Sequence, residues 1–147
     1  MSGFMEVFSR ASKVMRAVTE TALRRHGLYL GQNRVLAALW AEDGQTPGAI
    51  AAALNVTTPT VVVMATRMAT AGLITRRRDD PDNRLVRLYL TDAGRALQQP
   101  VEEELRRIEQ HVTAGLTAAE RRALTKALEK LTENALTLVS EPIGETG

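Results

Sequence analysis

The sequence contains no cysteine, and this absence removes several kinds of chemistry at once. Disulfides, thiolate zinc sites, iron–sulfur clusters, cysteine nucleophiles and thiol-based redox sensing all require a thiol. The only two histidines, His26 and His111, lie far apart in the chain, so a shared metal site is also disfavoured. We therefore expect neither a metal nor a cofactor.

Aromatic residues and long apolar runs are also scarce. Aromatic side chains make up only 3% of the chain, which argues against the stacking platforms that bind single-stranded nucleic acid. No apolar run approaches the roughly 20 residues that a membrane span needs, and the amino terminus lacks the apolar core of a secretory signal. These features predict a cytoplasmic protein with no membrane partner.

Carboxylates are missing from one long stretch of the chain. No acidic residue occurs between Asp43 and Asp79. Residues 1–95 carry 13 Lys/Arg against 8 Asp/Glu, whereas residues 96–147 carry 6 against 9. A surface without carboxylates can approach a phosphate backbone without like-charge repulsion. From charge alone, chance in an apolar segment explains the gap equally well.

Motifs for catalysis are absent as well. The chain has no glycine-rich phosphate loop, no nucleophile elbow and no cluster of metal ligands. Its one dense acidic run, Asp79-Asp80-Pro81-Asp82, has the composition of an exposed turn, where solvation keeps carboxylates ordinary. We therefore expect that the protein is not an enzyme.

The two ends of the chain have the periodicity of amphipathic helices. One helix is expected over residues 4–25, and another follows a capping box that begins at Thr117. A further helix should start at Thr91 and be kinked by Pro100, because proline removes a backbone hydrogen bond. The tail at 142–147 is expected to be frayed.

The middle of the chain predicts two short helices that meet across a tight turn. Thr46-Pro47 and Thr57-Thr58-Pro59 each combine an N-cap with a first-turn proline, and Asn55 between them tolerates positive φ. Alternating apolar residues over 73–78 and 85–90 then predict a β-hairpin with a polar tip. A short helix, a tight turn, a second helix and a hairpin together make a winged helix-turn-helix.

In that arrangement the second helix can enter the major groove of DNA. Its amino end presents short polar side chains, and two valines are expected to face outward, where a methyl group can contact thymine: the candidates are Thr57, Thr58, Thr60, Val62 and Val63. The alternative for the two valines is burial against another helix.

Several strings in this region are hard to obtain by chance. They include Ile50-Ala51-Ala52-Ala53-Leu54-Asn55-Val56, Ala71-Gly72-Leu73-Ile74, Arg76-Arg77-Arg78-Asp79-Asp80-Pro81-Asp82-Asn83-Arg84 and Val86-Arg87-Leu88-Tyr89-Leu90-Thr91-Asp92-Ala93-Gly94-Arg95. On these strings, residues 28–97 resemble the DNA-binding lobe of the MarR family of bacterial transcriptional regulators. The layout of the flanking helices is similar to that of the family too.

The resemblance implies a mainly α fold with a small β wing. Residues 31–91 would form the winged helix-turn-helix lobe, between an N-terminal dimerisation helix at 1–30 and C-terminal dimerisation helices with a short tail at 92–147. The apolar stripes of the flanking helices support this division, because a single small winged helix cannot bury them. We expect a homodimer that binds a pseudopalindromic duplex site.

The resemblance also implies roles for residues of the wing. Arg84 would reach into the minor groove, where the negative potential attracts arginine, and Asp82 would brace the wing by pairing with an arginine. Because side chains alternate along a strand, the neighbouring arginines cannot all serve one purpose. We expect Arg76 or Arg78 to contact the DNA backbone.

Two positions depart from the family pattern. Val63 stands where the recognition helix usually has an arginine, and Thr66 stands where an aspartate is often found. The first change removes an expected guanine or phosphate contact, and the second is expected to remove a partner for the wing arginine. The sequence therefore favours an operator rich in A and T.

The family resemblance further implies a small effector, often a phenolic or other aromatic acid, in the crevice between the dimerisation helices and the DNA-binding lobe. Met15 and Val18 are candidate lining residues, and the remaining candidates for an aromatic or anionic effector are Arg16, His26, Tyr29, Leu36 and Trp40. For each of these, an ordinary place in the core or on the surface is the competing interpretation.

These observations predict a DNA-binding transcriptional regulator, specifically a ligand-responsive homodimeric repressor. Two alternatives stay open. One is a dimeric helical module for protein interactions with weakened DNA binding, which Val63 and Thr66 motivate. The other is a constitutive regulator without a small-molecule effector.

Overall fold

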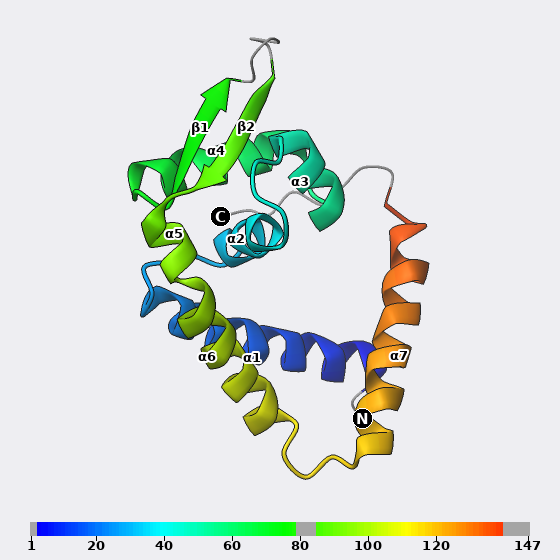
Figure 1. The fold of residues 1–147 in the computed structure, drawn as a ribbon. Coiled ribbons are helices and arrows are strands. Elements are labelled where there is room, and N and C mark those ends of the chain that lie inside the picture. The colour runs from blue at the N-terminus through cyan, green and yellow to red at the C-terminus, as the bar shows by residue number, and fades with distance from the viewer. Residues whose placement is uncertain (1–2, 79–84, 140–147) are drawn as a thin grey trace.

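The computed structural model describes residues 3–78 and 85–139, which are mainly helical with one small antiparallel sheet (Figure 1). This confirms the predicted fold class. The elements, in chain order, are α1 (Phe4–Arg24), α2 (Gln32–Ala41), α3 (Pro47–Leu54), α4 (Thr58–Thr70), β1 (Ile74–Arg78), β2 (Val86–Leu90), α5 (Asp92–Ala96), α6 (Gln98–Val112) and α7 (Ala118–Leu136).

Local capping chemistry sets the starts of α3 and α4. The side chain of Thr46 accepts a hydrogen bond from the backbone N–H of Ala49, and the side chain of Thr57 accepts one from the backbone N–H of Thr60. Between the two helices, Asn55 has a φ of 53°, the left-handed conformation that the sequence predicted. The tight turn of the helix-turn-helix is therefore confirmed.

The hairpin is also confirmed. β1 and β2 pair antiparallel, with Ile74 opposite Leu90 and Arg76 opposite Leu88. An isolated bridge between Gln45 and Leu88 attaches the hairpin to the segment that links α2 and α3. The tip at 79–84, which contains Asp82 and Arg84, lies outside the described residues.

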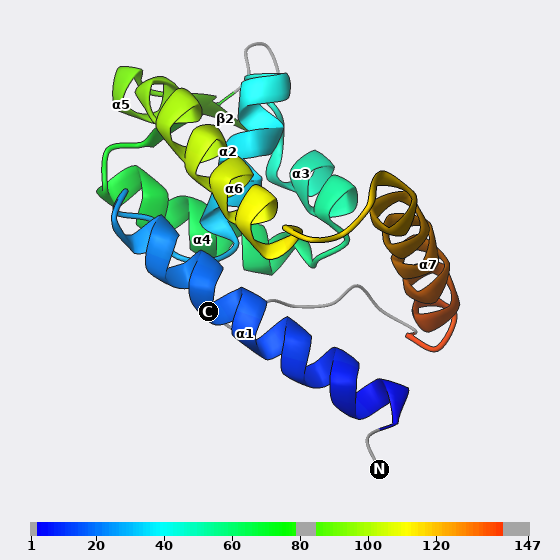
Figure 2. The ribbon, with the colours of Figure 1, turned by 90° about the horizontal axis from the view of Figure 1, so that it is seen from below.

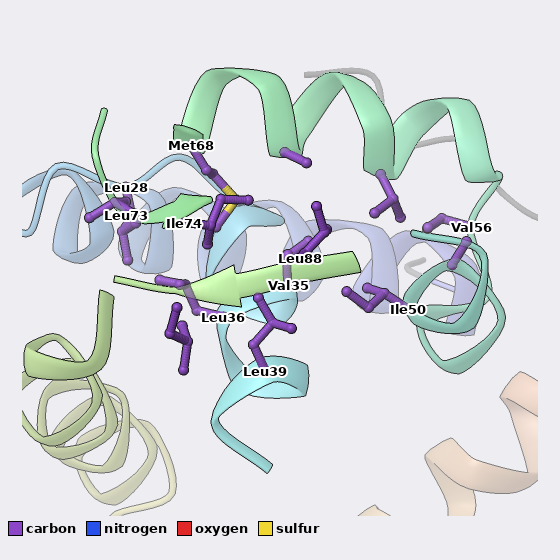
Figure 3. Close-up of a cluster of buried hydrophobic side chains, with 14 of the residues drawn as sticks. Leu28, Val35, Leu36, Leu39, Ile50, Val56, Met68, Leu73, Ile74 and Leu88 are labelled. Carbon is purple, nitrogen blue, oxygen red and sulfur yellow. The ribbon is translucent and has the colours of Figure 1, made fainter. Parts of the chain in front are cut away.

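The hydrophobic core lies where α2, α3, α4 and the hairpin meet (Figure 3). Its largest fully buried side chains are Leu23, Leu28, Leu36, Leu39, Ile50, Met68, Ile74, Leu88, Val35, Val61 and Val101. Leu23 and Leu28 precede the winged helix-turn-helix and Val101 follows it, so the core extends across the boundaries at residues 30 and 91. That three-part division of the chain stays a prediction.

The segment after the hairpin differs from the prediction of one helix kinked by Pro100. The structure breaks the helix at Leu97, which ends α5 and starts α6. Pro100 lies in the first turn of α6, where backbone N–H groups have no partner within the helix. Proline therefore costs no helical hydrogen bond at this position. In the last helix, the predicted capping box at Thr117 and Glu120 is confirmed. Leu138 falls beyond the end of α7 and is exposed.

Most of α1 and all of α7 stand away from the core, and only the carboxyl end of α1 reaches it. Figures 1 and 2 show the amino-terminal part of α1 projecting beyond the winged helix-turn-helix, and α7 set apart from α6. No residue of α7 is buried, and in α1 only Ala22 and Leu23 are buried.

In the described part of the chain, no single helix has both the length and the apolar character to cross a membrane. Only α3 and α4 taken together, with a bend of 115° between them, meet those criteria.

Candidate nucleic-acid interface

Helix α4 turns one face into the core and the opposite face to the surface. Val61, Ala65 and Met68 are buried, whereas Val62 and Val63 are 40% and 53% exposed. The two valines are therefore not buried against another helix of this chain. The outer face of α4 is available to an external partner.

The three threonines at the amino end of α4 do different things. Thr57 and Thr60 are half-buried; Thr57 caps the helix, and the hydroxyl of Thr60 lies 2.7 Å from that of Thr57, so both hydroxyls are engaged within the helix start. Thr58 is exposed at the first position of the helix. Of the three predicted contacts, Thr58 is placed best to reach a ligand from the amino end of α4.

The arginines of β1 line the surface beside α4 and differ in their partners. Arg76 donates a hydrogen bond from Nη1 to Thr66 Oγ1, at 3.2 Å. The Arg77 guanidinium stacks over the ring of Tyr89, with its carbon 4.8 Å from the ring centroid. Arg78 is exposed at the end of the strand. The alternation of the strand separates Arg77 from the other two, as the sequence predicted.

The Thr66 contact corrects one expectation. Thr66 was expected to deprive a wing arginine of its partner, because it stands where an aspartate is often found. Its hydroxyl nevertheless accepts the hydrogen bond from Arg76. The partner is kept, but it is neutral rather than charged.

A groove of about 330 Å³ separates α4 from the hairpin. The residues that line it are Pro47, Val62, Ala65, Arg76, Arg77, Arg78, Val86 and Leu88. Five of its lining residues are apolar and none is acidic, and of its three arginines Arg76 and Arg78 share one face of β1. The groove thus combines apolar contact with positive charge, the combination that a DNA surface requires.

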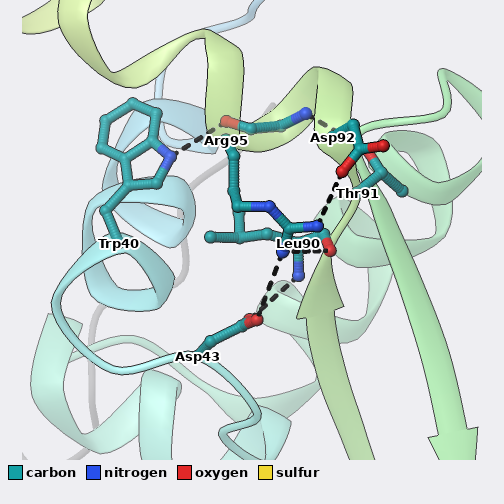
Figure 4. Close-up of polar contacts among 7 residues, drawn as sticks. Trp40, Asp43, Leu90, Thr91, Asp92 and Arg95 are labelled. Carbon is teal, nitrogen blue, oxygen red and sulfur yellow. Dashed lines mark hydrogen bonds and ion pairs between the residues drawn. The ribbon is translucent and has the colours of Figure 1, made fainter.

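A polar network at the base of the hairpin fixes the orientation of the wing (Figure 4). Arg95 donates to the Leu90 carbonyl oxygen at 3.2 Å and to Asp92 Oδ1 at 2.9 Å. Asp43 Oδ1 accepts the Leu90 N–H at 2.9 Å, and Trp40 Nε1 donates to the Gly94 carbonyl oxygen at 3.0 Å. The network ties α2, β2 and α5 together.

Sequence reasoning missed this network. The string that contains Gly94 and Arg95 was noted only as a mark of family resemblance. Its partners, Trp40 and Asp43, lie about fifty residues earlier in the chain, and no spacing rule connects them.

The five predicted effector residues have different surroundings in the described part of the chain, and their role at an effector site stays a prediction. Leu36 is fully buried in the core, and the indole of Trp40 is engaged in the network at the base of the wing. Arg16 pairs with Glu20 on the surface of α1. Tyr29 is exposed and lines a separate hollow beside α4, with Thr60, Val63 and Arg67 among the other lining residues.

The fifth of these residues, His26, belongs to an ion-pair cluster that joins α1 to α6. Glu104 of α6 accepts a hydrogen bond from Arg25 Nη1 at 2.7 Å, and its other oxygen contacts His26 Nε2. Burial raises the pKa of Glu104, but hydrogen bonds and charges from His26 and Arg25 outweigh this, so the pKa is lowered overall. The cluster connects the end of α1 to the helix that follows the wing.

Metal-binding clusters are not found in residues 3–78 and 85–139, where no three His, Asp or Glu side chains gather into a group that could hold an ion. His26 and His111 are not brought together into such a group.

The helix-turn-helix formed by α3 and α4, followed by the β1–β2 hairpin, defines a winged helix-turn-helix protein. Sequence comparison identifies the family within this class, because a model of the MarR family matches residues 28–86. The chain is 30% identical over 122 residues to the HTH-type transcriptional repressor Rv2887 of Mycobacterium tuberculosis, which covers 83% of this chain and 88% of the repressor. The chain belongs to the MarR family.

Two further comparisons agree with this assignment. The HTH-type transcriptional regulator TtmR of Methylorubrum extorquens is 32% identical over 128 residues, which is 85% of this chain, and the chain spans 63% of the length of TtmR. Among solved structures, the transcriptional repressor CouR bound to a 23-mer DNA duplex superposes with a TM-score of 0.80 at 27% identity. That match covers 88% of this chain and 92% of CouR.

Proposed function

We propose that the protein regulates transcription by binding a specific site on double-stranded DNA, with α4 in the major groove and the hairpin beside it. The observation that carries the proposal is the outer face of α4. There Thr58, Val62 and Val63 are exposed, and Val62 lines a groove together with the arginines of β1, in a stretch of sequence without a carboxylate. The solved complex of CouR with a DNA duplex supports the same use of this fold.

We further propose that the protein acts as a homodimer. The support comes from the outer helices, where apolar side chains of α1 and α7 line a common groove of about 290 Å³ and remain exposed in the single chain. A twofold-symmetric dimer would present two copies of α4 to successive major grooves, roughly 34 Å apart. The DNA site would then be a pseudopalindrome, and a bound repressor would occlude it.

Within this proposal, Arg76 and Arg78 contact phosphates of the DNA backbone. Arg84 in the minor groove and Asp82 as its brace lie outside the described residues, and their roles rest on the family resemblance. A regulator of this kind acts on the chromosome, which is why we place it in the cytoplasm of a bacterial cell.

The proposed effector is a small aromatic or anionic molecule. Of the predicted lining residues, Tyr29 has the best geometric support, because it is exposed beside α4. Release of bound DNA by an aromatic acid such as 4-hydroxybenzoate, with loss of this release in Tyr29→Ala, would support it. DNA binding that no such acid alters would indicate a constitutive regulator.

Selection of binding sites from random duplex DNA tests the proposed function. The selected sites should be rich in A and T at the positions that face Val62 and Val63, because valine methyl groups contact thymine but cannot hydrogen-bond guanine. Val63→Arg should shift the selected sites towards guanine, since arginine pairs with the O6 and N7 atoms of guanine. Guanine-centred sites that Val63→Ala leaves unchanged would contradict the proposed reading of the helix.

A further inference from the structure

Helix α4 and strand β1 are joined by a hydrogen bond between side chains. Arg76 Nη1 donates to Thr66 Oγ1 at 3.2 Å, and Thr66 Oγ1 in turn donates to the Val62 carbonyl oxygen at 2.9 Å. The single hydroxyl hydrogen of Thr66 is therefore committed to the backbone of α4. Its oxygen lone pairs are left to accept from Arg76, and the direction of both bonds is fixed.

The bond holds Arg76 without cancelling its charge. A guanidinium has five N–H donors, and the bond to Thr66 uses one of them. The sequences of α4, β1 and β2 contain no carboxylate, and Arg76 has no ion-pair partner among the described residues. Because both side chains are exposed, the remaining donors of Arg76 can reach a phosphate.

We propose that Thr66 is a positioning residue, which holds the Arg76 guanidinium against α4 and leaves its full positive charge for a DNA phosphate. The inference rests on the proposed DNA-binding function. An aspartate at this position would accept two parallel hydrogen bonds from Arg76 and neutralise it. The neutral hydroxyl gives the same placement and keeps the charge.

The salt dependence of DNA binding tests this inference, because its slope counts the phosphates that the protein neutralises. Fluorescence anisotropy over a series of salt concentrations would measure binding to the DNA duplex that the wild-type protein selects from random sequences. The slope of log K against log salt is negative, and Thr66→Asp should make it shallower by about 0.9 for each bound protomer. The matched control Thr66→Asn, which has nearly the same shape without the charge, should keep the wild-type slope.

A double-variant comparison shows whether the effect acts through Arg76. Arg76→Gln should make the slope shallower by the same amount as Thr66→Asp does. The double variant Arg76→Gln/Thr66→Asp should have the same slope as Arg76→Gln alone. Equal slopes for Thr66→Asp and Thr66→Asn would overturn the proposal. An undiminished effect of Thr66→Asp in the Arg76→Gln background would overturn it too.

An uncharged pair of variants tests the placement itself. Thr66→Val removes the acceptor and should weaken binding by about two- to tenfold at constant slope, and Thr66→Ser should restore the wild-type affinity. Unchanged affinity in Thr66→Val would contradict a positioning role. If the wild-type protein binds no duplex at low salt, the proposed function itself fails, and this result is distinct from every outcome for the variants.

Discussion

The winged helix-turn-helix and the outer helices use their apolar residues in opposite ways. In the first region, apolar side chains of α2, α3, α4 and the hairpin close a core in which Val35, Leu36 and Leu88 have no exposed surface. In the second, α7 has no buried residue, and Phe4 and Leu128 remain 56% and 38% exposed.

The difference shows what amphipathic periodicity does and does not specify. The same spacing of apolar residues identifies the inner face of α4 and the apolar face of α7, yet only α4 finds its partner within the chain. Apolar side chains that stay exposed side by side along one groove are typical of an interaction surface.

The largest effect is expected at the outer helices. Leu128→Asp places a charge in the apolar groove between α1 and α7, where a partner subunit would bury it. We expect the dissociation constant of the dimer to rise about 1,000-fold or more, because an unpaired buried charge costs about 3–5 kcal/mol and the dimer would bury two of them. Sedimentation velocity measures the change, and circular dichroism should show that the winged helix-turn-helix stays folded.

Lys126→Asp is the matched control, because it introduces the same side chain into α7 at a position that does not line the groove. The control should remain dimeric. A dimer of undiminished affinity in Leu128→Asp would contradict the assignment of this groove to the subunit interface.

The next effect is expected at Gly94, in α5 at the base of the wing. A Cβ at this position would lie 2.1 Å from the Leu73 carbonyl oxygen, which also accepts the Thr91 N–H. Gly94→Ala must therefore displace the base of the wing, and we expect it to lower the free energy of unfolding by about 3 kcal/mol. Urea unfolding gives the value.

Gly48→Ala provides the comparison for that measurement, since the nearest atom to its added Cβ is Thr58 Oγ1 at 4.0 Å. Alanine favours a helix more than glycine does, so this variant should be neutral or more stable by up to about 1 kcal/mol. Equal stability losses in the two variants would show that the close approach at Gly94 is unimportant.

A smaller effect is expected at Glu104, which joins the outer helix α1 to α6. Glu104→Gln removes the charge that Arg25 and His26 contact, and should lower the free energy of unfolding by roughly 1–2 kcal/mol. Glu103→Gln is the control, because Glu103 pairs with Arg107 on the exposed surface of the same helix, and it should change stability by less than about 0.5 kcal/mol. Equal losses of stability in Glu104→Gln and Glu103→Gln would contradict a special role for Glu104.

The same cluster predicts a pH dependence. The pKa of Glu104 is lowered in the folded protein from its usual value of 4.5, so its carboxylate contributes stability above that value. This contribution should be lost as the pH falls through the lower, folded pKa. The acid side of a plot of unfolding free energy against pH should therefore be flatter in Glu104→Gln than in the wild type, and identical slopes would contradict the assignment.

Much of the lobe could be predicted from the sequence because its signals are local. The caps at Thr46 and Thr57, the left-handed Asn55 and the alternation of the hairpin each depend on residues within a few positions. A helical period also identifies which residues of α4 face inward.

The remaining features depend on contacts between distant parts of the chain. The hydrogen bond from Arg76 to Thr66 and the network around Arg95 form only after the elements have packed. The break at Leu97 has no local signal that the sequence analysis used. Leu36 is buried in the core, and its role in lining an effector site stays a prediction, because periodicity tells which face is covered and not what covers it.

The arrangement of the selected DNA site tests most directly whether two copies of α4 read successive major grooves. Sequencing of duplexes enriched by the wild-type protein should yield an inverted repeat whose half-site centres lie about 10 base pairs, or one helical turn, apart. Leu128→Asp should enrich no such repeat. Enrichment of a single unrepeated half-site, or of no sequence at all, would contradict the symmetric two-helix reading of DNA.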